Sequence, residues 1–388
     1  MCVLVAVNQL GFGSIVPTLP LYAKSFGVSA SAIGMAIAVY GLARFVIAVP
    51  SGQLADRFGR RPTLALGGLV SALGNLWCAE ASEYPEFLVA RFVAGVGAGL
   101  ILTTGQVVLA DITSPARRGR TIAIYQGVFL FAVGIGPLPG GFLAEQWGLT
   151  APFLGYGVAS LVAGAVAWFA VRETRDLAHG QGAGGRGERP PFMTQMRLLA
   201  EQIGFVLASV ISLMNAVART GALFNIVPIL GSVRLSLSVS EIGFGLALGS
   251  VTGLLVAYPA GMLVDYFGRK AVIVPATVIS GASLLVFCVA PSYFWFTTGC
   301  VLWGVASSIG GAAPAAYAAD SAPEGMNAAA MSTFRMVGDL GYVVGPIGLG
   351  LVVDGFGPEA ALVLAATLLI VVGLLFAKLA PETYRGRR

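Results

Sequence analysis

A charged ten-residue stretch lies between two long apolar runs of this chain. It reads Gly52-Gln-Leu-Ala-Asp56-Arg57-Phe-Gly59-Arg60-Arg61. An aspartate next to arginines can form ion pairs or cap a helix terminus. Glycine permits a tight turn and a close helix contact. We therefore expect Gly52 to pack closely on a neighbour, Asp56 to end a helix, Gly59 to make a turn, and Arg60 and Arg61 to hold the loop at a membrane surface.

Five further ionisable residues lie inside apolar runs, where a charge is costly unless it is paired or hydrated. They are Arg44, Arg91, Arg219, Arg335 and Asp339. Arg335 and Asp339 are spaced i, i+4 and can pair on one helix face. We place Asp339 deep in the membrane, where it could exchange a proton against a substrate or form a permanent ion pair. Arg91 could couple protons or extend to the membrane interface.

Several neutral side chains could line a central cavity, although packing or lipid contact is an equal alternative. The polar ones are Asn8, Gln9, Asn215 and Asn225, and the aromatic ones are Phe12, Tyr125 and Trp303.

Composition predicts the elements that must position these residues. Of the 388 residues, 57% are hydrophobic and 11% are charged, whereas soluble domains carry about 25% charged residues. The apolar runs are continuous, which favours membrane-spanning helices over a barrel of alternating strands. No pairing of a nucleophile with a base and no metal-ligand spacing occurs, so we expect no enzyme, no cofactor and no metal site. The basic residues lie in short loops, which indicates membrane topology and not nucleic-acid binding.

Runs of about 20 apolar residues predict twelve transmembrane helices. We place them at about 2–22, 31–54, 63–79, 86–110, 120–143, 151–171, 203–230, 239–263, 271–290, 293–318, 328–352 and 359–379. This divides the chain into a six-helix bundle at 1–171, a linker at 172–202, a second six-helix bundle at 203–380 and a tail at 381–388. The fold class is therefore an all-α membrane protein with two pseudo-symmetric bundles.

The two halves repeat each other at an offset of 209 residues. The charged stretch recurs as Gly261-Met-Leu-Val-Asp265-Tyr-Phe-Gly268-Arg269-Lys270. In the same register Asp111 matches Asp320, and Gly136-Pro137 matches Gly345-Pro346. Glu173-Thr174 likewise matches Glu382-Thr383. Parallel repeats of six helices are typical of large secondary transporters.

The distribution of basic residues predicts the orientation. The loops on one side, together with the C-terminal end, hold 17 of the 23 Lys and Arg residues, whereas the other side holds only Lys24 and Arg234. The positive-inside rule therefore places both termini and the linker in the cytoplasm.

The stretch Gly52 to Arg61 matches every fixed position of G-x-x-x-D-R-x-G-R-R and so resembles the loop 2-3 signature of the major facilitator superfamily. The resemblance covers the whole chain. It implies a secondary transporter whose loop acts as a gate that stabilises the outward-facing state. The second copy has Tyr266 and Lys270 where the first has Arg57 and Arg61, so we expect a weaker gate there.

Two more motifs resemble those of drug/proton antiporters in this family. Arg91-Phe-Val-Ala-Gly95-Val-Gly97-Ala-Gly99 is similar to R-x-x-x-G-x-G-x-G, which the family links to proton coupling. The stretch Ala132 to Gly141 is similar to g-x-x-x-G-P-x-x-G-G, with Ala132 in place of its first glycine. The resemblance implies a hinge at Gly136, Pro137, Gly140 and Gly141. Ordinary small-residue packing is the alternative.

The resemblance implies a proton-coupled exporter of small amphipathic compounds or drugs in the plasma membrane, which for a bacterium is the inner membrane. Its partners would be the substrate, protons and the lipid bilayer, with the proton gradient as driving force, and we expect a monomer. However, Asn8 and Gln9 stand where many such antiporters carry an acidic residue in the first helix. Four arginines against one carboxylate would favour anionic or zwitterionic cargo, so an importer of an organic anion or a sugar stays open.

Overall fold

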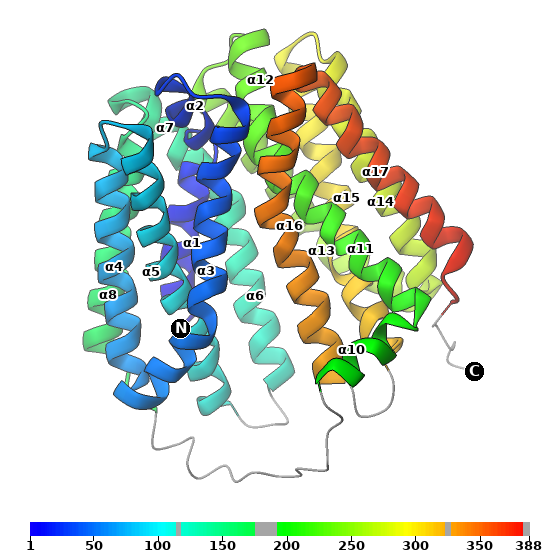
Figure 1. Ribbon diagram of the computed structural model, residues 1–388, viewed down its shortest axis with the longest axis horizontal. Coiled ribbons are helices and arrows are strands. Elements are labelled where there is room, and N and C mark those ends of the chain that lie inside the picture. The colour runs from blue at the N-terminus through cyan, green and yellow to red at the C-terminus, as the bar shows by residue number, and fades with distance from the viewer. Residues whose placement is uncertain (114–117, 175–191, 323–326, 383–388) are drawn as a thin grey trace. The chain divides into compact units, whose positions relative to one another are not determined.

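The computed structural model describes residues 1–113, 118–174, 192–322 and 327–382, and every regular element within these ranges is a helix (Figure 1). Residues 175–191 of the predicted linker and 383–388 of the predicted tail lie outside the described part. The helices are α1 (Cys2–Ile15), α2 (Leu19–Ser25), α3 (Ala30–Phe58), α4 (Arg60–Glu80), α5 (Tyr84–Ile112), α6 (Arg118–Ile135), α7 (Pro137–Trp147), α8 (Ala151–Ala170), α10 (Phe192–Ala200), α11 (Ile203–Val217), the π-helix η2 (Ala218–Ile226), α12 (Val227–Arg234), α13 (Val239–Phe267), α14 (Arg269–Val289), α15 (Tyr293–Asp320), α16 (Asn327–Phe356) and α17 (Pro358–Leu379).

The described residues contain eleven helical spans long and apolar enough to cross a membrane. The pair α1 and α2, bent by 47°, makes a twelfth if it is counted as one span. Pro17 lies at this bend and Pro20 in the first turn of α2. Proline has no N–H to donate the backbone hydrogen bond that would continue α1, so the helix is interrupted here. The predicted fold class is confirmed.

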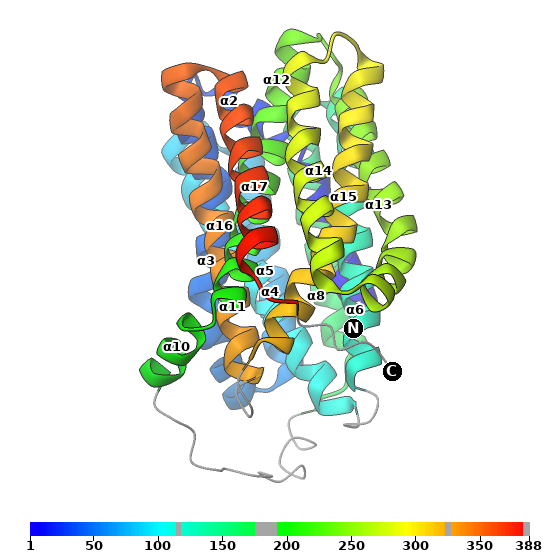
Figure 2. The same ribbon diagram turned by 90° about the vertical axis from the view of Figure 1, so that its right-hand side faces the viewer.

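Two compact units make up the chain: Met1–Gly185 with Leu237–Ala247, and Arg186–Ser236 with Leu248–Arg388. Each unit uses the same helix pairing. In the first unit α4 packs against α5 and α8, while α1 packs against α6 and α8. In the second unit α14 packs against α15 and α17, while α11 packs against α16 and α17 (Figure 2). The sequence repeat is thus also a repeat of tertiary contacts.

Glycines allow the helices within each unit to approach backbone to backbone. A Cβ atom on Gly97 of α5 would collide with the backbone of Ser71 in α4, and one on Gly68 would meet the backbone of Gly164 in α8. In the second unit, a Cβ atom on Gly304 of α15 would collide with the backbone of Gly249 in α13. Small residues at helix contacts are the usual solution in membranes, where van der Waals packing holds helices together.

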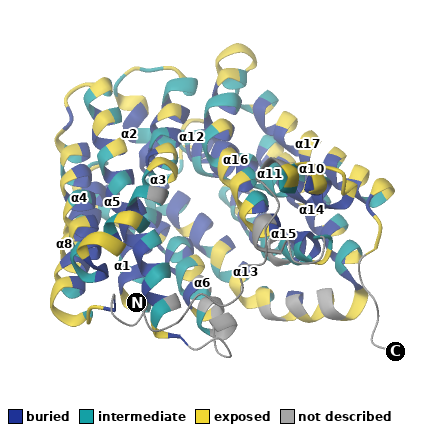
Figure 3. Ribbon diagram, turned by 60° about the horizontal axis from the view of Figure 1, so that its bottom comes forward, coloured by how far each residue is buried: buried dark blue, intermediate teal, exposed yellow. Residues whose placement is uncertain are grey.

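The outer faces of the helices are apolar. Along α4, the large side chains of Leu66, Leu69 and Leu73 are exposed, whereas Leu64 and Ala72 are buried. Figure 3 shows how buried and exposed residues divide along the helices. An exposed leucine stripe at helical spacing suits contact with lipid chains.

Two predicted spans are interrupted. The predicted helix at 120–143 is divided at Gly136 into α6 and α7, because Pro137 has no N–H to donate. The predicted helix at 203–230 changes into the nine-residue π-helix η2 at Ala218. Such wide turns are rare and occur frequently at functional sites.

Candidate functional site

The α3–α4 turn of the first unit depends on Gly59. This residue has φ +103°, a conformation that favours glycine, and it both ends α3 and precedes α4. Contrary to expectation, α3 does not end at Asp56 but continues to Phe58, since the positive φ of Gly59 is what stops it. The close packing expected at Gly52 is also absent among the described atoms: a Cβ atom there would meet nothing within 4 Å.

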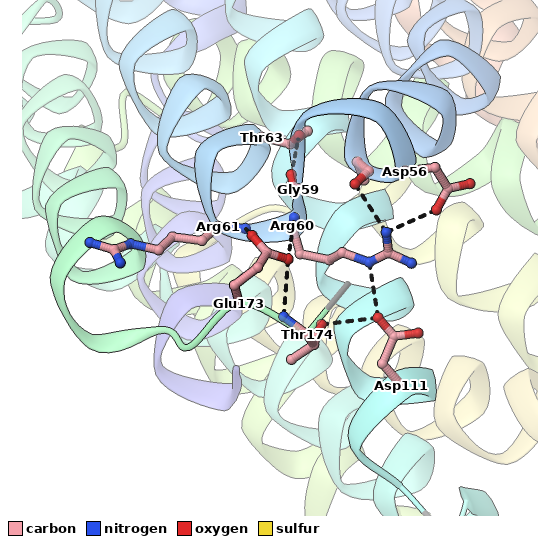
Figure 4. Close-up of polar contacts among 9 residues, drawn as sticks. Asp56, Gly59, Arg60, Arg61, Thr63, Asp111, Glu173 and Thr174 are labelled. Atoms are coloured by element: carbon pink, nitrogen blue, oxygen red, sulfur yellow. Dashed lines mark hydrogen bonds and ion pairs between the residues drawn. The ribbon is translucent and has the colours of Figure 1, made fainter. Parts of the chain in front are cut away.

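Arg60, which is itself buried, lies at the centre of a polar cluster, drawn in Figure 4. Its side chain is only 4% exposed and its Nε donates to Asp111 Oδ2 at 3.0 Å. Its Nη1 donates to the Ala55 carbonyl and to Asp56 Oδ1, each at 3.0 Å. The guanidinium of Arg60 thus turns inward to these acceptors. That Arg60 also holds the loop at a membrane surface stays a prediction.

Glu173, which follows α8, binds the first turn of α4. Its two carboxylate oxygens accept hydrogen bonds from the backbone N–H groups of Arg60 at 2.9 Å and Arg61 at 3.1 Å. These groups have no acceptor within the helix, and a carboxylate there also interacts favourably with the helix dipole. The neighbouring Thr174 hydroxyl donates to Asp111 Oδ2 at 3.0 Å. The chain segments around α3, α4, α5 and α8 are thus joined by one polar cluster, which we call the Arg60 cluster: Asp56, Arg60, Asp111, Glu173 and Thr174.

Arg61 has a different environment from Arg60. Its guanidinium lies over the ring of Trp168 in α8, 4.8 Å from the ring centre. Arg57 lies 5.3 Å from the ring centre of Phe58 and is exposed. Cation–π contacts of this kind stabilise modestly at exposed sites. The three basic residues of the signature therefore make two kinds of contact: ion pairs for Arg60 and cation–π contacts for Arg57 and Arg61.

The second unit repeats the cluster in a more exposed form. Gly268 has φ +93°, and Arg269 Nε lies 3.1 Å from Asp320 Oδ2. Glu382 accepts the backbone N–H of Lys270 at 3.3 Å, and Lys270 Nζ donates to the Ala380 carbonyl at 2.9 Å. The side chains of Arg269 and Asp320 are 19% and 38% exposed, against 4% and 10% for Arg60 and Asp111. The side chain of Asp265 lies outside the described part of the chain.

The sequence motif alone did not identify Asp111, Glu173 and Thr174 as site residues. A signal was available, because Asp111 and Glu173 were landmarks of the 209-residue repeat and their counterparts Asp320 and Glu382 make the same contacts. A polar residue that recurs beside a repeated ion-pairing motif is a candidate partner for it.

The glycines that follow Arg91 fit α5 between two neighbours. Cβ atoms on Gly95 and Gly99 would collide with α3, at Tyr40 and Ile47, whereas one on Gly97 would collide with α4. Arg91 lies one turn before Gly95, on the face of α5 that meets α3. The spacing of the motif is therefore a packing pattern that brings Arg91 against α3.

Arg91 is fully buried, with 1% of its surface exposed. Its Nε donates to the Ala36 carbonyl at 3.1 Å, and its guanidinium lies 4.4 Å from the ring centre of Tyr40. The Tyr40 hydroxyl lies 3.1 Å from the Tyr156 hydroxyl, which donates to Asn8 Oδ1 at 3.3 Å. The side chain of Arg91 thus turns into the protein, against α3.

The other intramembrane charges are less enclosed than expected. Arg335 and Asp339 pair at 3.8 Å, with side chains 61% and 49% exposed. Their helix α16 buries the face that carries Phe334, Gly338 and Gly341, and the pair lies off that face. The protein itself therefore encloses Asp339 only partly, and its place deep in the membrane stays a prediction. Arg44 in α3 and Arg219 in η2 are half-buried.

The stretch Gly136 to Gly141 packs closely against its neighbours. Cβ atoms on Gly136 and Gly140 would collide with the backbone of α1 at Gly13 and Ser14. One on Gly141 would meet the carbonyl of Val239, which belongs to the same compact unit. The repeat copy behaves alike, since a Cβ atom on Gly345 would meet Val217 of α11.

Repeated six-helix units with polar clusters at matching helix turns define a multi-pass membrane transporter, and comparison with known proteins gives its family. The sequence profile of the Major Facilitator Superfamily matches residues 1–235 and 208–388, so the chain belongs to this family of transporters and is not an enzyme. An MFS-type transporter of Methanocaldococcus jannaschii is 23% identical over 95% of this chain and 94% of its own. The multidrug resistance protein MdtL of Shewanella sp. is 25% identical over 73% of this chain and 70% of its own. The crystal structure of a D-xylose-proton symporter matches with a TM-score of 0.76, at 18% identity, over 100% of this chain and 98% of its own.

Replacing Glu173 by glutamine is expected to lower the free energy of unfolding by about 1 kcal/mol, because the charge at the first turn of α4 and one of two acceptors are lost. Equilibrium unfolding in detergent micelles measures this change. The matched control is Glu382→Gln, since the Glu382 carboxylate accepts the backbone N–H of Lys270 at the longer distance of 3.3 Å. A larger loss for Glu382→Gln than for Glu173→Gln would contradict this account of the cap.

Proposed function

We propose that this transporter exports small amphipathic compounds in exchange for protons. The observation that carries the proposal is the Gly136–Gly141 stretch, which resembles the antiporter motif and packs against α1 without room for a Cβ atom at Gly136 or Gly140. The likeness to a multidrug resistance protein supports the same cargo class. Gly136, Pro137, Gly140 and Gly141 would form the hinge about which the helix moves.

The gate is the second part of the proposal. The Arg60 cluster and its copy around Arg269 would hold each bundle rigid at the cytoplasmic end while the bundles rock about a central substrate site. Bundles at 1–171 and 203–380, a cytoplasmic linker at 172–202 and a cytoplasmic tail at 381–388 fit the distribution of Lys and Arg. The greater exposure of Arg269 and Asp320 supports a weaker second gate. We also propose a monomer in the plasma membrane.

A second candidate is an importer of an organic anion. The fully buried Arg91, for which the described residues offer no carboxylate partner, favours an anionic cargo. Coupling residues would be drawn from Arg44, Arg91, Arg219, Arg335 and Asp339 in either case.

Transport into inside-out membrane vesicles tests the proposal. With an acidic lumen, we expect ethidium or a fluoroquinolone to accumulate in vesicles that contain the protein, because protons leaving the lumen would drive cargo in. A protonophore should abolish this accumulation, and vesicles without the protein provide the baseline. Movement that does not depend on the pH gradient would refute antiport, and gradient-driven movement out of the vesicles would favour the importer.

A further inference from the structure

Arg91 is a buried cation without a counter-charge in the part of the chain that the structure describes. Its side chain is 1% exposed and its Nη1 atom has no hydrogen-bond partner there. No described aspartate or glutamate lies within ion-pairing distance of it, in contrast to Arg60, which pairs with two. A buried guanidinium that lacks a carboxylate is costly, because a charge in apolar surroundings must be compensated.

The polar groups around Arg91 are neutral, and their hydroxyl and amide groups already donate hydrogen bonds to one another. Tyr156 donates to Asn8 Oδ1, so the hydrogen in the contact between the two phenols must come from Tyr40. Asn8 Nδ2 in turn donates to Gln9 Oε1 at 2.9 Å. This chain of hydrogen bonds supplies dipoles and no negative charge. The Tyr40 ring and the Ala36 carbonyl therefore orient the guanidinium but leave its charge unbalanced.

We propose that Arg91 binds one negatively charged group, which its Nη1 atom would contact. The group is either a carboxylate of the cargo or a small inorganic anion, since both offer a charged acceptor to a guanidinium. Phe12, which is half-buried and stacks on Tyr40 at 5.3 Å between ring centres, is the most exposed side chain of this set.

The inference rests on the proposed transport function where the anion is a carboxylate of the cargo. Binding is measured without transport, however, so either idea can fail alone. A protein that binds anions but moves cargo without a pH gradient retains the site and refutes the antiporter.

Calorimetric titration of the purified full-length protein in neutral detergent tests the site. Sodium benzoate and sodium chloride are the two probes, and benzamide is the uncharged control of the same shape as benzoate. We expect benzoate, chloride or both to bind and benzamide not to bind. Benzoate alone would identify a cargo carboxylate, and chloride alone an inorganic anion. If neither anion binds, or if benzamide binds as tightly as benzoate, the proposal is wrong.

Variants assign the binding to Arg91. Arg91→Gln should abolish it, and Arg91→Lys, which keeps the charge but not the planar fork, should weaken benzoate binding about 10-fold or more. The Lys variant serves if the Gln variant does not fold. Arg197→Gln removes a positive charge that is 84% exposed in α10 and should leave the affinity unchanged. Unchanged affinity in Arg91→Lys would overturn the proposal.

Discussion

Replacing Arg60 by glutamine is expected to lower the free energy of unfolding by about 3–5 kcal/mol and to abolish transport. The loss is large because Arg60 is 4% exposed and its removal leaves Asp111, which is 10% exposed, without its cation. The Ala55 carbonyl also loses a donor. Glutamine cannot supply the several N–H groups that reach Asp56, Ala55 and Asp111 at once. Equilibrium unfolding in detergent micelles and vesicle transport measure the two effects.

Arg269→Gln is the matched control, since Arg269 and Asp320 have the same geometry in the second unit but are 19% and 38% exposed. Solvent screens this pair more strongly, so we expect a loss of about 1 kcal/mol. Asp111→Asn should also lower the free energy of unfolding, as Arg60→Gln does, because it leaves the buried guanidinium with less negative charge. Equal losses for Arg60→Gln and Arg269→Gln would show that burial does not determine the strength of the cluster.

The difference between the two clusters has a consequence for the transport cycle. If each cluster fixes one bundle at its cytoplasmic end, the first bundle is the more rigid body there and the second yields first. Rocking would then begin with strain at Arg269 and Lys270 and not at Arg60. Arg269→Gln should accordingly change the transport rate clearly, although it lowers the free energy of unfolding by only about 1 kcal/mol.

The sequence predicted those features that depend on local chemistry. The turn at Gly59 followed from its place between two apolar runs, and the structure gives it φ +103°. The break at Pro137 followed from the missing N–H of proline. Apolar run length and the 209-residue repeat predicted helical spans in two related units. These signals lie in one residue or one short window, so they can be found without tertiary contacts.

Features that depend on tertiary contacts could not be predicted from the sequence. Arg60 and Arg61 are adjacent and alike, yet one is buried against Asp111 and the other lies over Trp168. Which direction each side chain takes depends on where α5 and α8 lie. The exposure of Asp339 likewise depends on which face of α16 meets α11. The π-helical turn in η2 has no sequence signature that we can identify.

Asp339→Asn is expected to remove the dependence of transport on the pH gradient while leaving cargo binding intact. Asp339 pairs with Arg335 at 3.8 Å, and both side chains are about half exposed. This pair is longer than the 3.0 Å pair of Arg60 and Asp111, so the carboxylate is held less tightly and can exchange a proton without a large cost to the fold. Asparagine has nearly the same shape but cannot take up or release a proton. Transport would then continue only down the gradient of the cargo itself.

The matched control is Asp354→Asn, which makes the same change near the other end of the same helix, also at an exposed position. We expect it to retain gradient-driven accumulation in inside-out vesicles, because Asp354 lies two residues before Phe356, the last residue of α16, and so at the end of the apolar span and not in its middle. Measuring ethidium or fluoroquinolone uptake with and without an acidic lumen separates coupling from binding. If Asp339→Asn still accumulates cargo in response to the gradient, Asp339 only holds Arg335 in place. The proton must then be carried by another group.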